Sequence, residues 1–533
     1  MATVRDASFD VFRRLGMTTI FSNPGSTEVS LLTDLPDDLD FVLGLHEASV
    51  VGIATGHALA SERAALVILH TTAGLGNAVG ALATARVNRA PLVVIVGQQD
   101  RRHLALEPFL AGRLPQLAGD YPVWVDQPVR PQDVPGSIAR AWHEATVGHG
   151  PALVIVPMDD WLALAGEAEQ AAPARMLIGR SPRPESVAEV AELVGASSHP
   201  LLVVGAGLDS VAGWRGSTAL AERLGCAVYQ ESFGARAGFP QDHRQFAGHL
   251  PAGRSRLRAV LAPYDLVIVI GAPVFRQYPF EDGPLVPEGT SVVMVTDDSS
   301  EASRSPADLA VLADPAEFAH KLAAQVSVRP GTTVAARQAG RPAPAQHGSR
   351  LRAAHVLAAL SDRLPPNTIV VEETPSSRPD LHELLPAREP LGFVSAAMGG
   401  LGFAMPAAIG LKMAAPERPV VAVLGDGSSL YSIQSLWSAA RYDVGALFVV
   451  LANGRYAIMD RLAEKEDTGP APWPAFEEVS VSGLATNLGC PITRAAGITE
   501  LTEVLDEVIP TLSTRKSPLV LEVAVQTERD FQA

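Results

Sequence analysis

Polar residues suited to bind a metal ion and a phosphate group follow two apolar runs near the carboxyl end of this 533-residue sequence. Gly425, Asp426 and Gly427 come directly after the run VVAVL, and Asn453 follows the run ALFVVLA, 27 positions after Asp426. If both runs are parallel strands, these residues meet at the carboxyl edge of one sheet, where open α/β sheets bind ligands. Glycine lets the backbone approach a phosphate, the following stretch SLYSIQSLWSAARY predicts a helix with free N–H groups at its start, and carboxylate and amide oxygens suit Mg²⁺ or Ca²⁺. The spacing therefore predicts a site for a diphosphate and a divalent metal.

A second group of residues, suited to proton transfer, lies near the amino end. Glu47 follows an apolar run (FVLGLH) and opens a stretch of small residues (ASVVGIATGHALA) that is typical of a buried helix. His70 stands where the run ALVIL ends, and Ser22–Thr27 (SNPGST) follow the run TIF, so all of them face one predicted sheet edge. For an isolated Glu47 the better explanation would be an acid that stabilises a helix N-terminus, and for an isolated His70 it would be a buried, hydrogen-bonded histidine. The matching group in the last part of the chain favours acid–base chemistry.

The elements that position both groups are predicted from short apolar runs that alternate with longer Ala- and Leu-rich stretches. Continuous apolar strands between helices are typical of parallel sheets covered on both faces. Two stretches rich in Pro, Gly and Ala, about 166–185 and 328–350, predict linkers. We therefore expect three doubly wound parallel-sheet α/β domains, at 1–165, 186–327 and 351–533. The predicted strands include Thr19–Ser22, Phe41–Leu45, Ala65–His70, Leu92–Gly97, Ala152–Pro157, Leu201–Gly205, Leu266–Gly271, Ser291–Val295, Thr368–Glu372, Val420–Leu424, Ala446–Leu451 and Leu519–Val525.

The first and third predicted domains share a strand, a Gly-rich turn and an Ala-rich helix (HTTAGLGNAVGALATA and SAAMGGLGFAMPAAIG). This predicts two related domains with a different one between them. The glycines of AGLGNAVG miss the GxGxxG spacing of a dinucleotide fingerprint, and no acidic residue ends the next apolar run. The stretch therefore does not predict a dinucleotide site.

Charge and composition exclude several classes of protein. The formal net charge is −16, no Lys/Arg block interrupts it, and nucleic acid is therefore not an expected partner. Two cysteines, Cys226 and Cys490, do not form a disulfide framework and favour a reducing cytoplasm. The amino end lacks the apolar region of a signal peptide, and no apolar stretch reaches the roughly 18 residues of a membrane helix, so we expect no membrane partner.

The GDG motif followed by Asn453 resembles the thiamine-diphosphate motif that pyruvate decarboxylases and acetolactate synthases share. Along nearly the whole chain, the order of segments is similar to that of the benzoylformate decarboxylase family; these segments are FSNPGS, LHEASVVGIATGHA, LHTTAGLGNAVGAL, VIVGQQ, VIGAPVFR, GGLGFAMPAAIG and GDGSSLYSI. Three features depart from the family pattern. Ala452 stands before Asn453 where the family often has a second asparagine, and Tyr278 stands where a second active-site histidine is expected. The stretch GRYAIMDRLAEKE is bulkier and more charged than its family counterpart.

The resemblance implies a role for each candidate residue. Asp426, Asn453 and the carbonyl group of Arg455 would hold Mg²⁺ or Ca²⁺, and Glu47 would activate the cofactor by hydrogen bonding to its pyrimidine ring. Ser26 would bind the substrate carboxylate, His70 would transfer protons, and Leu401 would lie under the bent cofactor. Tyr278 would replace the missing histidine as a proton donor. The implied cofactor-binding residues are Asn23, Pro24, Gly25, Glu47, Thr374, Ser376, Gly399, Leu401, Gly425, Asp426, Gly427, Ser428, Asn453 and Tyr456.

By this resemblance we expect a thiamine-diphosphate-dependent enzyme that decarboxylates a 2-keto acid to an aldehyde and carbon dioxide. We also expect a homodimer or homotetramer with active sites at subunit interfaces. The bulk of Ile458, Met459 and Leu462 makes benzoylformate a modest substrate at best. The nearest alternative is a carboligase of the acetolactate-synthase type that joins two keto acids. A flavin-binding oxidoreductase and a non-catalytic relative are further alternatives, which the missing GxGxxG and the presence of Glu47 and Asp426 disfavour.

Overall fold

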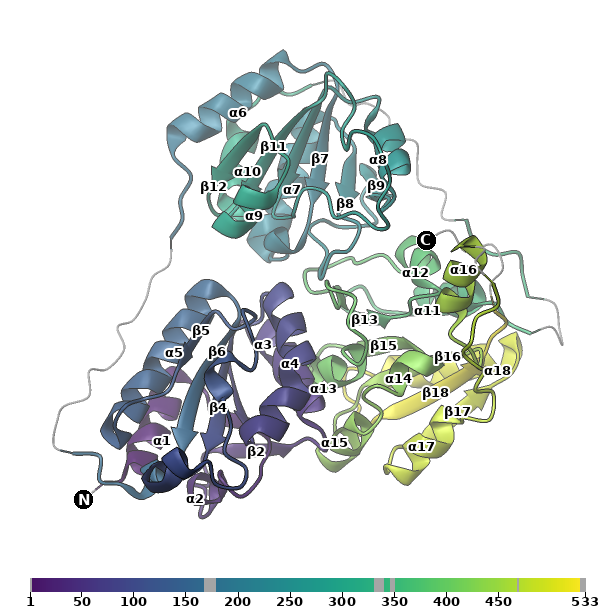
Figure 1. Cartoon of the computed structure of the whole chain (residues 1–533). Coiled ribbons are helices and arrows are strands. Elements are labelled where there is room, and N and C mark those ends of the chain that lie inside the picture. Colours follow the sequence, from purple (N-terminus) through teal and green to yellow (C-terminus); the bar gives the residue numbers. More distant parts are fainter. Residues whose placement is uncertain (1, 167–178, 330–339, 346–349, 467–468, 528–533) are drawn as a thin grey trace.

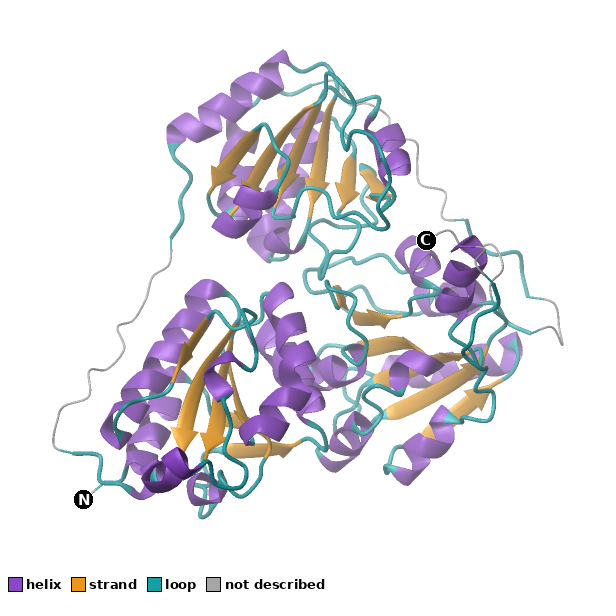
Figure 2. Ribbon diagram, viewed as in Figure 1, coloured by secondary structure: helices purple, strands orange, loops and turns teal. Residues whose placement is uncertain are grey.

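The computed structural model of the chain describes residues 2–166, 179–329, 340–345, 350–466 and 469–527. It contains three six-stranded parallel sheets with flanking helices (Figures 1 and 2), which confirms the predicted α/β class. Most of the two predicted linkers lies outside the described residues, and the exact domain boundaries stay predictions. No described helix is long and apolar enough to cross a membrane.

The first sheet has the strand order β2-β1-β3-β4-β6-β5. Its strands are β1 (Thr19–Asn23), β2 (Asp40–Leu43), β3 (Ala65–Leu69), β4 (Leu92–Gln98), β5 (Trp124–Asp126) and β6 (Pro151–Pro157). Its helices are α1 (Val4–Leu15), α2 (Val29–Leu32), α3 (Glu47–Ser61), α4 (Thr71–Val87) and α5 (Val134–Gly148).

The third sheet has the same topology, in the order β14-β13-β15-β16-β18-β17. Its strands are β13 (Ile369–Glu373), β14 (Phe393–Ser395), β15 (Val420–Gly425), β16 (Leu447–Ala452), β17 (Ile492–Ala495) and β18 (Leu519–Ala524). Its helices are α11 (Ala353–Ser361), α12 (Arg378–Leu384), α13 (Ala404–Ala414), α14 (Asp426–Ser429), α15 (Ser435–Arg441), α16 (Ala457–Glu466), α17 (Val481–Asn487) and α18 (Ile498–Val508).

The central sheet differs, with the order β12-β11-β10-β7-β8-β9. Two related domains around a different one were predicted, and the strand orders agree with that prediction. The central strands are β7 (Pro200–Val204), β8 (Val228–Gln230), β9 (Phe246–His249), β10 (Leu266–Ile270), β11 (Ser291–Thr296) and β12 (Leu309–Leu312). The helices are α6 (Pro184–Ala196), α7 (Val211–Leu224), α8 (Arg254–Leu261), α9 (Ser299–Arg304) and α10 (Pro315–Gln325).

The first and third sheets are joined by helices of small residues that pack very closely. A Cβ atom at Gly52 of α3 would lie 2.6 Å from Cγ of Pro406 on α13, and one at Gly410 would lie 1.8 Å from the carbonyl oxygen of Ile53. Only glycine permits this approach, which places α13 directly against α3 (Figure 1).

One predicted element is wrong. The stretch SLYSIQSLWSAARY was expected to form one helix, but α14 ends at Ser429 and α15 begins only at Ser435. Between them, Ser432 and Ser435 donate backbone hydrogen bonds to residues three positions earlier, as in turns. Serine side chains compete for backbone hydrogen bonds and favour such turns over helix interiors.

Candidate active site

The carboxyl edge of the third sheet forms a pocket of about 390 Å³, which we call the Asp426 pocket. It brings together the following predicted residues of the third domain: Thr374, Ser376, Leu401, Gly425, Asp426, Gly427, Ser428, Asn453, Arg455 and Tyr456. Asp426 and Asn453 follow neighbouring strands, because β15 pairs with β16 in parallel. The edge placement predicted from the two apolar runs is therefore present.

Asp426 is buried at the end of β15, and its carboxylate organises the opposite loop. Oδ2 accepts hydrogen bonds from the backbone N–H groups of Asn453 (2.9 Å) and Gly454 (2.6 Å), and Oδ1 accepts one from Gly427 (2.8 Å). Burial raises the pKa of Asp426, while these hydrogen bonds act in the opposite direction. No Lys, Arg or His side chain of the described residues forms an ion pair with it. A buried carboxylate without a cation is costly, and a bound metal ion would offset that cost.

Gly427 fits this pocket because of its neighbour Tyr456. A Cβ atom at Gly427 would lie 2.7 Å from Cε1 of Tyr456, whose ring packs on Phe476. The four-residue α14 offers fewer aligned peptide dipoles than the long helix that we had expected. The start of this short helix alone therefore offers an anion in the pocket less stabilisation than a long helix would.

Glu373 fixes the loop that carries Leu401, a role that its place in the sequence did not predict. Its side chain is buried, and it accepts backbone hydrogen bonds from Gly402 (2.7 Å), Phe403 (2.8 Å) and Ala404 (2.7 Å). Burial raises the pKa of Glu373 to about 7. These contacts hold the start of α13, and with it Leu401, at the border of the Asp426 pocket.

The residues predicted in the first domain gather at the carboxyl edge of the first sheet, and we call Asn23–Thr27, Glu47 and His70 the Glu47 half-site. Glu47 begins α3, and its Oε2 accepts a hydrogen bond from Nδ2 of Asn77 on α4 (3.1 Å). Asn23 ends β1, and an exposed Ser26 lies in the turn that follows. Gly25 leaves room for His70, since a Cβ atom there would lie 2.4 Å from two atoms of the imidazole ring.

Glu28 orients His70, a role that its place in the sequence did not predict. Nδ1 of His70 lies 3.1 Å from Oε2 of Glu28 and 2.9 Å from Oγ1 of Thr27. Because a carboxylate only accepts hydrogen bonds, this contact favours the tautomer with the proton on Nδ1. Nε2 is then the nitrogen that can accept a proton from a ligand.

Within one chain, the Glu47 half-site and the Asp426 pocket lie at opposite ends of α4. His70 precedes the first residue of α4. At the other end, Asn88 donates a hydrogen bond to the carbonyl oxygen of Ser395 (2.9 Å), and a Cβ atom at Gly400, next to the pocket residue Leu401, would lie 3.2 Å from Oγ1 of Thr84. At 1.5 Å per residue, the separation along the helix is roughly 20 Å. No residue that lines the Asp426 pocket comes from the described part of the first domain.

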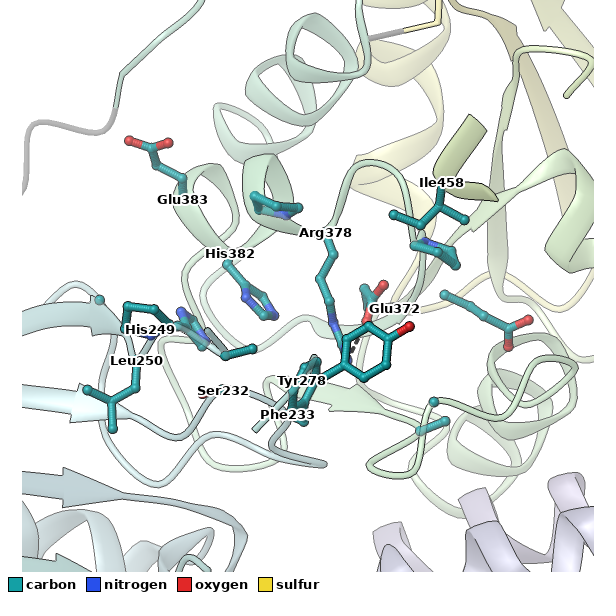
Figure 3. A pocket seen from close by; sticks show the side chains of 18 of the residues that line it. Ser232, Phe233, His249, Leu250, Tyr278, Glu372, Arg378, His382, Glu383 and Ile458 are labelled. Carbon is teal, nitrogen blue, oxygen red and sulfur yellow. Dashed lines mark ion pairs between the residues drawn. The ribbon is translucent and has the colours of Figure 1, made fainter. Parts of the chain in front are cut away.

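A second cavity, the Tyr278 chamber, has a volume of about 530 Å³ and lies between the central and third domains. It adjoins the Asp426 pocket, because Pro375, Leu401 and Ile458 line both cavities. Tyr278 enters from the central domain with 57% of its surface exposed, and the predicted cofactor residue Gly399 also lies in this wall. Figure 3 shows Tyr278 beside the ion pair between Arg378 and Glu372 (3.0 Å).

Comparison with known proteins shows to which family the chain belongs. Residues 2–117, 187–322 and 376–523 match the N-terminal TPP binding domain, the central domain and the C-terminal TPP binding domain of thiamine pyrophosphate enzymes. The chain is 37% identical to benzoylformate decarboxylase of Pseudomonas aeruginosa over 99% of both chains. The chain belongs to the thiamine-diphosphate-dependent 2-keto acid decarboxylase family.

Other relatives of this decarboxylase agree with that assignment. The crystal structure of benzoylformate decarboxylase from Polynucleobacter necessarius superposes with a TM-score of 0.94, at 34% identity, and each chain is covered completely. A putative acetolactate synthase large subunit of Mycobacterium tuberculosis is 28% identical, over 92% of this chain and 93% of the relative. The acetolactate-synthase type is thus the more distant of the two resemblances.

A small cavity lies at the carboxyl edge of the central sheet. In the described residues, the cavity beside Gly207, Glu231 and Gly271 has a volume of only about 20 Å³. Backbone contacts fill the space, since a Cβ atom at Gly271 would lie 2.8 Å from the carbonyl carbon of Gly207.

Of the three bulky residues after Asn453 that were predicted to line the pocket, two do so. Ile458 lines both cavities of this decarboxylase and Met459 lines the Asp426 pocket, but Leu462 lines neither. Pocket residues that the sequence analysis missed are Glu372, Arg378, Tyr431 and Trp473. Arg378 follows β13 and Tyr431 follows the GDG motif at short distance, whereas Glu372 lies within β13 and Trp473 has no such signal.

Proposed function

We propose that this decarboxylase holds thiamine diphosphate through a divalent metal in the Asp426 pocket and converts a 2-keto acid bulkier than benzoylformate into an aldehyde and carbon dioxide. The observation that carries the proposal is the buried Asp426 carboxylate, which lies beside Asn453 and has no cationic partner in the described residues. Hard oxygen ligands of this kind suit Mg²⁺. The carbonyl group of Arg455 is the third proposed ligand.

The fit of the cofactor rests on the shape and polarity of the Asp426 pocket. Thr374, Ser376 and Ser428 offer hydroxyl groups along its wall, and Leu401 supplies the apolar surface. When bound, thiamine diphosphate supplies the carbon nucleophile that attacks the keto carbon and the charged ring that accepts the electrons left by carbon dioxide.

The residues of the chain would bind the substrate and transfer the protons that the reaction needs. Glu47 accepts a hydrogen bond from Asn77 at Oε2, and its Oε1 would hold or release a proton at the pyrimidine ring of a bound cofactor. Glu28 keeps the proton on Nδ1 of His70, so Nε2 accepts and returns the proton at the substrate. The hydroxyl group of Ser26 hydrogen-bonds the substrate carboxylate.

We further propose that each active site is completed by a second copy of the chain, in a homodimer or a dimer of dimers. The support is the separation of roughly 20 Å along α4 between the two parts of the site in one chain. A cytoplasmic location stays a prediction from the two free cysteines.

Mixing two inactive variants should therefore restore activity. In a mixed dimer of Glu47→Gln and Asp426→Ala subunits, one of the two shared sites has neither substitution. We expect carbon dioxide release to return after subunit exchange, and light scattering to show no active monomer on dilution. A fully active monomer, or a mixture that stays inactive although mass spectrometry shows mixed dimers, would contradict a shared site.

Tyr278→Phe tests the proton donor that replaces the family's histidine. If its phenol protonates the reaction intermediate, turnover should fall while KM stays nearly constant, because only a late proton transfer is lost. His70 can still transfer protons in this variant, so we expect a decrease of about 10-fold. A Phe variant with wild-type turnover would assign the protons to His70 alone.

The substrate proposal is tested by comparing kcat/KM for benzoylformate with that for branched aliphatic and longer aromatic 2-keto acids. Ile458 and Leu401 line both cavities, and the chamber of about 530 Å³ has room for more than a ring attached directly to the keto group. We expect a longer keto acid to be preferred. A preference for benzoylformate of tenfold or more, about 1.4 kcal/mol in transition-state binding, would contradict this expectation.

A further inference from the structure

The lining of the Tyr278 chamber contains a buried ion pair. Nη2 of Arg378 in α12 lies 3.0 Å from Oε2 of Glu372 in β13, and the two side chains are only 19% and 4% exposed (Figure 3). When one partner of a buried ion pair is removed, the charge of the other stays behind without compensation. The charge of Glu372 in this structure is therefore balanced by Arg378.

Glu372 also acts on the Asp426 pocket, through Thr374. Oε1 of Glu372 accepts hydrogen bonds from the backbone N–H group of Thr374 (2.6 Å) and from its Oγ1 hydroxyl group (3.1 Å), and Thr374 lines the Asp426 pocket. Because a carboxylate only accepts hydrogen bonds, both donors of Thr374 are directed to Glu372. Thr374 then has no hydrogen left to donate to a diphosphate in the pocket.

Negative charge behind this part of the pocket wall opposes the binding of a diphosphate. Glu372 and its neighbour Glu373 are both buried at the end of β13, and burial raises the pKa of Glu373 to about 7. Charges interact strongly where little water screens them, so an ionised Glu372 without a cation would repel an anion on the other side of Thr374. The guanidinium group of Arg378 removes this repulsion.

The position of Arg378 is fixed by contacts with two domains. Its Nη2 also donates a hydrogen bond to Oγ of Ser395 at the end of β14 (2.8 Å). Oγ of Ser395 in turn donates one to the carbonyl oxygen of Gly234 in the central domain (3.1 Å). A guanidinium group that is held at several points needs little further ordering when a ligand binds nearby, so the charge balance is in place before the cofactor enters.

From these contacts we infer that Arg378 is a positioning residue for the diphosphate of the cofactor. Its charge neutralises Glu372, and Glu372 holds Thr374 in the wall of the Asp426 pocket. Arg378 thus acts through Glu372 and not by contact with the diphosphate. The inference rests on the proposed function and adds to it a residue from the chamber wall.

The test measures the affinity of the full chain for thiamine diphosphate, with Mg²⁺ present, by titration calorimetry. Arg378→Gln leaves the carboxylate of Glu372 uncompensated, so we expect the dissociation constant to rise at least about 10-fold. Glu372→Gln keeps an acceptor oxygen for Thr374 but removes the negative charge, so the affinity should increase or stay within about 3-fold of the wild type. A purely structural role of the pair would weaken binding in both variants, because both break the same contact.

Two further variants test the same charge balance if Arg378→Gln folds poorly. Arg378→Lys keeps the positive charge, and the double variant Arg378→Gln, Glu372→Gln removes both charges. Each should bind the cofactor within about 3-fold of the wild type. Arg363→Gln breaks an exposed ion pair with Asp506 in the same domain, and as the matched control it should not change the affinity.

The outcomes separate this inference from the proposed function. Equal losses of affinity in Arg378→Gln and Glu372→Gln, or in Arg378→Gln and Arg378→Lys, would overturn the inference and leave the decarboxylase assignment intact. An unchanged affinity in Arg378→Gln would overturn it as well. If the wild-type chain bound no thiamine diphosphate in the presence of Mg²⁺, the proposed function itself would be contradicted.

Discussion

Asp426→Ala is expected to abolish binding of thiamine diphosphate while the chain stays folded. The carboxylate is the proposed charged ligand of the metal, and the acidic chain has little else to hold a diphosphate. Replacing even an outer partner of a metal ligand typically costs about 10- to 100-fold in affinity, so the loss of the ligand should exceed ~100-fold. Titration calorimetry with thiamine diphosphate and Mg²⁺ measures this directly.

The same side chain also holds the backbone of Asn453 and Gly454, so the alanine variant could disturb the loop. Asp426→Asn therefore accompanies it, because the amide keeps the size and one acceptor oxygen but removes the charge. Asp506→Ala, which removes a surface ion pair with Arg363 in the same domain, is the matched control. Unchanged cofactor affinity in both Asp426 variants would place the diphosphate elsewhere.

Glu47→Gln is expected to lower turnover by at least ~100-fold with the cofactor still bound, the usual scale for a lost acid–base group. The glutamine can still accept the hydrogen bond from Asn77, but it cannot exchange a proton with the pyrimidine ring. Glu62→Gln, at the other end of α3, is the control and should be nearly neutral. Steady-state rates at saturating cofactor, with binding measured separately, distinguish a chemical defect from lost affinity. Normal turnover in the Gln variant would remove Glu47 from the mechanism.

The sequence predicted the inner strands of each sheet better than the outer ones. Inner strands such as β3 and β10 are buried throughout and read as continuous apolar runs. Of the strands that were not predicted, β5, β9, β12, β14 and β17 lie at sheet edges, and β8 is an inner strand of only three residues. β5 and β14 have three residues each, and β17 (ITRA) is largely solvent-facing, so these edge strands lack a clear apolar run.

The candidate site was predicted where a residue directly follows a strand, and missed where its role depends on a distant partner. Asp426, Asn453 and His70 each come directly after the last residue of a strand. Glu28 acquires its role from His70, 42 positions away, and Glu373 from Ala404, 31 positions away. Only the folded arrangement brings such pairs together.

The most direct test of the account is the amount of carbon dioxide released for each 2-keto acid consumed, measured over a panel of aromatic and aliphatic keto acids. With thiamine diphosphate and Mg²⁺ added, we predict one carbon dioxide and one aldehyde for each keto acid, and no release without the cofactor. The Glu47→Gln variant, measured under the same conditions, gives the background release of carbon dioxide. Release of one carbon dioxide for every two keto acids, with a joined product and no aldehyde, would identify a carboligase and contradict the account, as would release that needs no thiamine diphosphate.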